Sequence, residues 1–212
     1  MTDVKEYEQE YGHLKNNLLL LSAEGTLKTL MVVSAVSGEG SSTIASNLAV
    51  SLAHSSSLTV LLIDGNFRHP TIGEAFQLEK GKGLADLILG KVCVEDVLKK
   101  TKLPNLFVIT GGEYEGNPAD LFVSPRFKPF IEEVRGKFNY IIFDAAALAA
   151  YADSALLARC VDGVILVVQA GKTRWEVAQK ARAQLEMARA KILGVVLNRR
   201  KYVIPDFLYR HL

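Results

Sequence analysis

A stretch rich in glycine and hydroxyl residues follows the first apolar run of the sequence and directly precedes a segment with helical periodicity. It reads Ala-Val-Ser-Gly-Glu-Gly-Ser-Ser-Thr over positions 35–43. Its frame is that of the phosphate-binding loop G-x-x-x-x-G-K-[ST], with Ala35 in the first position, Gly40 in the second and Ser41 in place of lysine. Gly38 and Gly40 let backbone N–H groups converge on a phosphate, and the start of the following helix adds partial positive charge. The sequence therefore predicts a phosphate cradle that lacks the usual ammonium group.

The residues expected to contact phosphates are Gly38, Glu39, Gly40, Ser41, Ser42 and Thr43. In an intact loop the Ser42 hydroxyl would bind Mg²⁺, and Thr43 would help to bind a phosphate closer to the base. A glycine-rich turn before a helix is a weak signal by itself. The alternative is an ordinary strand-to-helix turn.

The missing lysine affects binding and catalysis differently. A hydrogen bond to a charged partner contributes roughly 1.5–3 kcal/mol, which corresponds to about one to two powers of ten in affinity. Removing one group that stabilises charge in the transition state typically costs about 10²–10³ in rate. We therefore expect weak nucleotide binding and little unaided turnover.

Two apolar runs, 58–63 and 140–143, end in the carboxylates Asp64 and Asp144. An aspartate at the tip of a buried strand is costly unless it is paired, and Mg²⁺ with its waters is the usual partner in such a setting. Ser42, Asp64 and Asp144 are therefore the predicted Mg²⁺ ligands. The alternative is that each aspartate caps a helix or stabilises a turn.

Short runs rich in Val, Ile and Leu alternate with segments of helical periodicity. The predicted strands span 30–36, 58–64, 106–110, 140–144, 163–169 and 192–198. The predicted helices span 42–54, 83–90, 94–100, 118–137, 152–160 and 173–190. Such alternation favours a mostly parallel sheet, because each parallel pair needs a crossover. The predicted class is α/β: a three-layer P-loop NTPase fold in which helices flank a mostly parallel central sheet and ligands bind beyond the strands' carboxyl ends.

An additional helix is predicted over residues 1–22, where Leu14, Leu18 and Leu21 form an apolar stripe. We expect residues 1–27 to be a helical extension and residues 28–212 to be the nucleotide-binding domain. The stripe either packs on this domain or serves self-association.

Composition narrows the functional classes. The 212-residue chain is 49% apolar and carries 25 Lys and Arg against 23 Asp and Glu, which gives no electrostatic argument for nucleic-acid binding. Its two cysteines, Cys93 and Cys160, show no metal-binding spacing and are predicted to be small core residues. No apolar run is long enough for a membrane span. We expect a cytoplasmic protein that reaches the inner face of a membrane only through a partner.

The chain resembles the bacterial tyrosine kinases of capsule and exopolysaccharide export over residues 9–200. The stretches that carry the resemblance are SAVSGEGSSTIASNLAVSLA, LLIDGNFRHP, ITGGEYEGNPADLF and YIIFDAAALAAYADSALLARCVDGVILVV. The family's motif I-D-x-D-x-R-x-P is matched by Ile63, Asp64, Arg68 and Pro70, with its second Asp replaced by Asn66. The resemblance implies ATP or ADP with Mg²⁺ as cofactors and Arg68 as a nucleotide contact. It also implies adenine binding by Asn198, for which a strand-ending turn is the alternative.

Four features of the family's activity are altered. Lysine is replaced by Ser41 and an aspartate by Asn66. The ring-forming motif E-x-x-R-x-x-R aligns with Gln9, Gly12 and Lys15, so ring assembly through those ion pairs is not expected. The tyrosine-rich tail of the family's kinases is reduced to Tyr202 and Tyr209.

These changes together lead to the hypothesis of a degenerate kinase, or pseudokinase, that regulates or scaffolds polysaccharide assembly. Its expected partner is a membrane polysaccharide co-polymerase or another protein of the exopolysaccharide machinery, and Asp64 would keep at most a residual catalytic role. One alternative is an active tyrosine autokinase or ATPase that uses a lysine from elsewhere. A second is a partition-type ATPase, although Val36 and Ser37 occupy the region of the signature lysine of that class.

Overall fold

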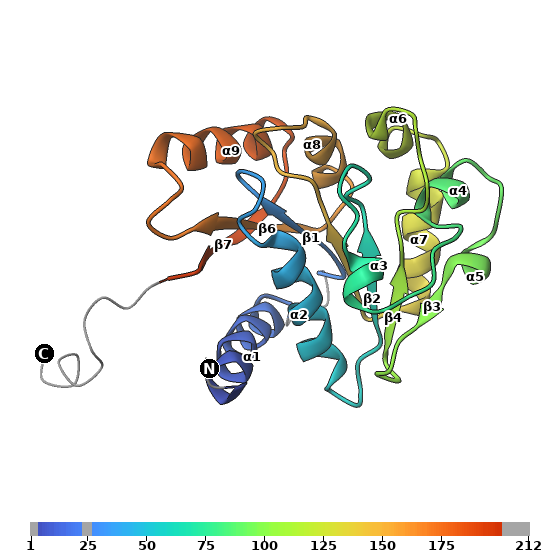
Figure 1. The fold of residues 1–212 in the computed structure, drawn as a ribbon, viewed down its shortest axis with the longest axis horizontal. Coiled ribbons are helices and arrows are strands. Elements are labelled where there is room, and N and C mark those ends of the chain that lie inside the picture. Colours follow the sequence, from blue (N-terminus) through green and yellow to red (C-terminus); the bar gives the residue numbers. More distant parts are fainter. Residues whose placement is uncertain (1–3, 23–26, 201–212) are drawn as a thin grey trace, which may run out of the picture.

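A seven-stranded sheet forms the centre of the protein in the computed structural model, which describes residues 4–22 and 27–200 (Figure 1). The strands are β1 (Thr29–Ser34), β2 (Val60–Asp64), β3 (Lys99–Lys100), β4 (Leu106–Ile109), β5 (Tyr140–Asp144), β6 (Gly163–Gln169) and β7 (Ile192–Asn198). Their order is β3-β4-β2-β5-β1-β6-β7, and every pairing is parallel except that of β3 with β4. The mostly parallel sheet predicted from the apolar runs is confirmed.

Helices cover both faces of the sheet. They are α1 (Val4–Leu21), α2 (Ser41–Ala53), α3 (Ile72–Ala75), α4 (Leu84–Ile88), α5 (Val94–Val97), α6 (Pro118–Phe122), α7 (Phe127–Lys137), α8 (Asp153–Ala158) and α9 (Trp175–Met187). Two separate apolar cores result, because successive side chains of a strand point to opposite faces. In β1, Leu30 and Val32 pack beneath α1, α2 and α3, whereas Met31 and Val33 pack beneath the helices of the other face. The predicted three layers are thus present.

Several predicted elements differ in detail. The helix expected over 118–137 is two helices, since Pro125 lies between α6 and α7 and disfavours helical backbone at the residue before it. The end of the helix expected over 94–100 is instead β3, and α3 had no predicted counterpart. These short elements lack a repeating apolar pattern, so their pairing and packing decided their conformation.

The α1 helix lies along α2 on one face of the sheet (Figure 1). Leu18 is buried and Leu14 packs against the same core, so the predicted stripe does contact the domain. Leu21, the last residue of the helix, is 52% exposed. The prediction that Leu21 shares the packed face with Leu14 and Leu18 is therefore wrong. The predicted domain boundary at residue 27 directly follows residues 23–26, which lie outside the described residues. Tyr202 and Tyr209 also lie outside them.

Cys93 is exposed, so its prediction as a core residue is wrong. It occupies the N-terminal cap of α5, where its N–H donates to Asp96 Oδ2 at 3.0 Å. Cys160 is half-buried. Within residues 4–22 and 27–200, no helix combines the length and apolar character that crossing a bilayer requires.

Candidate phosphate-binding site

The predicted phosphate loop connects β1 to α2 and lies at the carboxyl end of the sheet. Gly38 and Gly40 adopt positive φ angles of 84° and 94°, and Gly40 is the N-terminal cap of α2. A Cβ atom on Gly40 would lie 2.5 Å from Nδ2 of Asn198, so this position requires glycine for two reasons: its backbone conformation and the close approach of β7. The first turn of α2 leaves backbone N–H groups available to an anion.

Asn198 holds the loop from the neighbouring end of β7. Its Nδ2 donates to the carbonyl oxygen of Glu39 at 2.7 Å. The resemblance assigned Asn198 to adenine binding, but in this structure its amide NH₂ binds the protein's own main chain. Asn198 thus tethers the phosphate loop, and its role in adenine binding stays a prediction.

The side chain of Glu39 points into the protein, although Glu39 was predicted among the phosphate contacts. It is 1% exposed, and its carboxylate accepts hydrogen bonds from the N–H of Val36 at 2.9 Å and of Gln169 at 3.2 Å. The hydroxyl of Thr173 also donates to it. Glu39 thus links the loop to the end of β6, and only its main chain remains to face a ligand.

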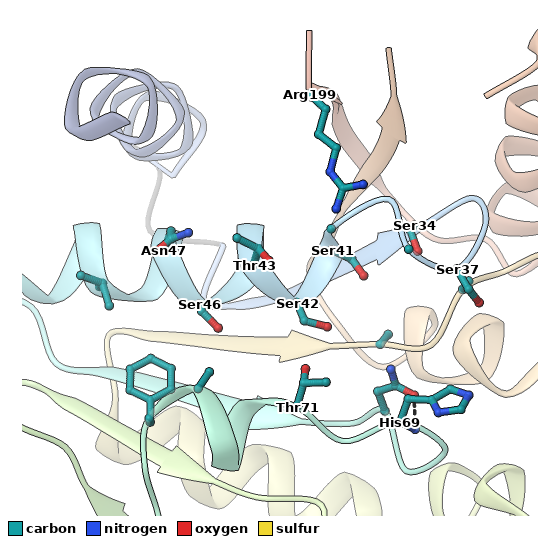
Figure 2. A pocket seen from close by; sticks show the side chains of 18 residues that line it. Ser34, Ser37, Ser41, Ser42, Thr43, Ser46, Asn47, His69, Thr71 and Arg199 are labelled. Atoms are coloured by element: carbon teal, nitrogen blue, oxygen red, sulfur yellow. Dashed lines mark hydrogen bonds between the residues drawn. The ribbon is translucent and has the colours of Figure 1, made fainter. Parts of the chain in front are cut away.

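A cavity of about 800 Å³ opens beside the loop, between α2 and the segment that leads from β2 into α3 (Figure 2). Five of the predicted contacts line it: Gly38, Gly40, Ser41, Ser42 and Thr43. Ser41, which replaces the lysine, is 8% exposed. Asn66 also lines the cavity, and its Oδ1 accepts a hydrogen bond from the N–H of His69 at 3.2 Å. The structure therefore brings the hydroxyls of the loop to one hollow, as the sequence predicted.

The two predicted acidic ligands lie side by side at the ends of adjacent strands. Asp64 in β2 pairs in register with Asp144 in β5, and both are fully buried. Asp64 is satisfied by the main chain: Oδ1 accepts from the N–H of Asn66 at 3.2 Å and Oδ2 from that of Ile72 at 3.1 Å. Burial raises the pKa of Asp64 to about 6, and these N–H groups oppose that rise.

Asp144 is held very differently. Both of its carboxylate oxygens are buried without a hydrogen-bond partner of good geometry. Burial raises the pKa of Asp144 to about 8; the nearby Ser42 hydroxyl lowers it, and the charge of Asp64 raises it further. A buried carboxylate without partners is a site that a cation would stabilise strongly.

The donor set fits Mg²⁺ better than a metal that needs a complete protein cage. No cluster of three or more His, Cys, Asp or Glu suited to a metal occurs within the described ranges. Two carboxylates and one hydroxyl suffice for Mg²⁺, which keeps several waters and takes further oxygens from phosphates. Ser42, Asp64 and Asp144 are the groups that would hold the ion, which would neutralise charge on the phosphates. Of the three, only Ser42 lines the cavity; Asp64 lines a neighbouring one, and Asp144 is buried beside Asp64.

Arg68, predicted as a nucleotide contact, instead packs against α8 and the turn before it. Its Nε lies 3.5 Å from Oδ2 of Asp153, and its guanidinium carbon lies 4.1 Å from the centroid of the Tyr151 ring. Arg68 does not line the cavity. The cation that does line it, Arg199, was missed, since its only sequence signal is its place directly after the strand-ending Asn198.

Comparisons with known proteins agree with this architecture. No protein-family model matches the chain. The tyrosine-protein kinase YwqD of Bacillus subtilis is 37% identical over 95% of this chain and 85% of its own length. The structure of the chimerical protein CapA2B2 superposes with a TM-score of 0.86 at 28% identity, covering 92% of this chain and 85% of that one. For the VpsO kinase domain the TM-score is 0.83 at 32% identity, with coverage of 94% and 98%.

A more distant likeness concerns the septum site-determining protein MinD of Pyrococcus horikoshii in complex with Mg-ADP. Its TM-score is 0.66 at 25% identity, covering 87% of this chain and 76% of that one. That protein was solved in complex with Mg-ADP, and this chain shares its overall fold.

Proposed function

Because the chain belongs to the bacterial tyrosine-protein kinase family, we propose that it is a degenerate member that binds a magnesium nucleotide but transfers phosphate slowly or not at all. In this proposal it regulates or scaffolds capsule or exopolysaccharide assembly. The nucleotide is ADP or ATP, held by the loop main chain and the hydroxyls of Ser42 and Thr43, with Mg²⁺ on Ser42, Asp64 and Asp144.

One observation carries the proposal: the loop presents the hydroxyl of Ser41 where the family's mechanism uses an ammonium group. Across the described parts of the chain, no lysine lines the cavity. Charge stabilisation at the transferred phosphoryl group is the main task of such a residue. Its loss therefore affects turnover more than binding.

The environment of Asp64 also supports slow transfer. A general base must be able to accept a proton from the attacking hydroxyl. Both oxygens of Asp64 already accept main-chain N–H groups and the residue is fully buried, so the carboxylate is poorly placed for that task. Any catalytic role of Asp64 would be residual.

The proposed partner is a membrane protein of the polysaccharide machinery, such as a co-polymerase, which would recruit the chain to the inner face of the membrane. Support comes from relatives named CapB and CpsD and from the similarity to the solved chimerical protein CapA2B2. The alignment of Gln9, Gly12 and Lys15 with the ring motif supports an assembly that does not depend on those ion pairs.

Calorimetry with MgADP and MgATP, followed by a phosphate-release assay and an anti-phosphotyrosine blot, tests the proposal. The expected result is measurable binding with turnover about 10²–10³ below that of an active relative assayed in parallel. Turnover at the relative's level, or autophosphorylation, would favour the active-kinase alternative. That alternative has one observation in its favour, because Arg199 brings a cation into the cavity.

A further inference from the structure

The cavity beside the phosphate loop contains a positive charge that does not come from the loop. Arg199 follows β7 directly, and its side chain extends toward the first turn of α2, where Ser41 lies (Figure 2). Arg199 and Ser41 line the same cavity although 158 positions separate them in the sequence (199 − 41). The position that lost its lysine thus faces an arginine from another element.

The backbone holds Arg199 in this place. Its φ of 55° lies in the left-handed region, which non-glycine residues adopt only when their surroundings impose it. Its N–H donates to Oδ1 of Asn198 at 2.8 Å, while Nδ2 of the same amide donates to Glu39 of the loop at 2.7 Å. One asparagine therefore ties the arginine's backbone and the phosphate loop together.

The charge of Arg199 is available to an anion. Among the described residues that line the cavity there is no Asp or Glu, and Arg199 is the only Lys or Arg. No ion pair in the described part of the chain involves its guanidinium. An anion in the cavity would meet this guanidinium together with the N–H groups of the loop and the helix start.

We propose that Arg199 supplies the positive charge that Ser41 cannot, and that it binds the phosphates of the nucleotide from the end of β7. This inference rests on the proposed nucleotide-binding function. The planar guanidinium can donate two hydrogen bonds to one phosphate, so it replaces the charge of a lysine with a different geometry. Its side chain extends toward Ser41 at the start of α2 (Figure 2), so the contact that we propose is with phosphate rather than with the base.

The test compares Arg199→Gln with Arg189→Gln. Arg189 is a matched control, since it is also an exposed arginine with a positive φ of 57°, but it follows α9 and does not line the cavity. MgADP and inorganic tripolyphosphate are titrated into each variant by calorimetry, and thermal melts of the free proteins verify folding. Arg199→Gln should lower the affinity for both ligands about tenfold to hundredfold, whereas Arg189→Gln should leave both affinities unchanged.

A second pair of variants tests whether Arg199 acts in place of the lysine. Ser41→Lys should restore MgADP affinity in the Arg199→Gln background and should add less affinity when Arg199 is present, because the two cations serve the same phosphates. Equal gains in affinity from Ser41→Lys in both backgrounds would contradict the proposal that Arg199 takes the place of the lysine. The proposal would also be contradicted if Arg199→Gln lost MgADP binding but bound tripolyphosphate as the wild type does, because Arg199 would then contact the base.

The two proposals fail in different ways. If the wild-type protein binds MgADP and Arg199→Gln binds it equally well, the inference about Arg199 is wrong while the nucleotide site stands. If the wild-type protein binds neither MgADP nor tripolyphosphate, both proposals are wrong.

Discussion

At the scale of single residues, the site consists of carboxylates and hydroxyls whose partners determine what they can do. Asp64 and Asp144 are equally buried neighbours, yet Asp64 accepts well-formed hydrogen bonds from main-chain N–H groups, whereas neither oxygen of Asp144 has a hydrogen-bond partner of good geometry. Burial without partners destabilises an ionised carboxylate, which is why the pKa of Asp144 rises further than that of Asp64. Asp144 is accordingly the residue that gains most from a bound cation.

The free protein should therefore lose stability between mildly acidic and alkaline pH. The pKa of Asp144 is about 8 in the folded protein against an ordinary value of 3.8. Between these values the folded state keeps a proton that the unfolded chain has released, so the free energy of unfolding falls with rising pH and levels off above pH 8. Asp144→Asn should remove the slope above about pH 6, below which Asp64 contributes a slope of its own. The variant should be more stable than wild type at pH 9, by on the order of 2 kcal/mol.

Urea denaturation at several pH values without Mg²⁺ measures this effect. Asp120→Asn is the control, because Asp120 is exposed in α6 and should leave the slope unchanged. A wild-type midpoint that rises from pH 5 to pH 9 in step with that of Asp144→Asn would contradict the assignment.

Restoring the family's residues at two positions of the cavity should strengthen nucleotide binding. In Ser41→Lys with Asn66→Asp, the ammonium adds a charged hydrogen bond and the carboxylate adds an oxygen ligand, so MgATP affinity should rise about tenfold or more. Calorimetry and phosphate release measure affinity and turnover. Ser56→Lys in the exposed turn after α2 controls for added charge, and no gain in either quantity would mean that the cavity does not accept a nucleotide.

At the scale of elements, the phosphate loop depends on two strands that do not contain it. Glu39 binds the end of β6 through the N–H of Gln169, and Asn198 binds the loop from the end of β7. The loop is thereby positioned before any ligand arrives, which lowers the entropic cost of binding. Substitutions at the end of β7 should accordingly alter the conformation of the phosphate loop.

Gly40→Ala should be more destabilising than Gly38→Ala. Both glycines have positive φ, but a Cβ at Gly40 meets Nδ2 of Asn198 at 2.5 Å, whereas a Cβ at Gly38 meets no atom within 4 Å. We expect a backbone cost of about 1–2 kcal/mol at both positions and a further loss at Gly40 from displacement of β7's asparagine. Chemical denaturation measures both variants.

The double variant Gly40→Ala with Asn198→Ala separates these contributions. Removing the Asn198 side chain opens the space that the new methyl group needs, so the two substitutions should cost less together than the sum of their separate effects. Strict additivity would show that the close approach has no energetic consequence.

At the scale of the whole molecule, two cores share one sheet, and a cluster of polar contacts stabilises the end of the sheet opposite the site. Asp162, before β6, accepts from the N–H of Lys28 at 2.9 Å and of Thr29 at 2.7 Å, and Arg135 of α7 lies 2.7 Å from the same oxygen. This cluster joins β1, β6 and α7 at the amino ends of the strands. It is half-buried, so water screens it only partly.

Asp162 should stabilise the protein above acidic pH. Burial raises the pKa of Asp162, but the hydrogen bonds from Thr29, Lys28 and Arg135 outweigh this and lower the pKa below its ordinary value. A group whose pKa is lowered by folding stabilises the protein at pH values above its pKa in the unfolded chain. This stabilisation is lost as the pH falls through its pKa in the folded protein. Asp162→Asn should cost about 1–3 kcal/mol at pH 7 and little at pH 2, as measured by urea denaturation.

Arg182→Gln provides the comparison, because it breaks the exposed pair of Arg182 with Glu186 within α9. Its effect should stay below about 0.5 kcal/mol. Equal losses in Asp162→Asn and Arg182→Gln would show that the Asp162 cluster does not fasten the sheet.

The sequence by itself determined the features that local pattern specifies. Runs of Val, Ile and Leu placed six of the strands. Five of them are buried on both faces, which requires apolar residues throughout, whereas β7 is apolar but partly exposed. Glycine spacing placed the phosphate loop, and Asp64 and Asp144 were found because a carboxylate that ends an apolar run is chemically conspicuous. The missing lysine at Ser41 could also be read directly.

Only the tertiary structure decided which side chains meet at the site. Asn198 and Glu39 are 159 positions apart, and no local pattern indicates that the amide of Asn198 binds the phosphate loop. Glu39 and Arg68 were assigned to the nucleotide, but their side chains bind the protein itself, and Arg199 reaches the cavity from β7. Local spacing specifies helices, strands and loops, whereas side-chain partners depend on strand order and packing, which bring distant residues together only when the whole sheet has formed.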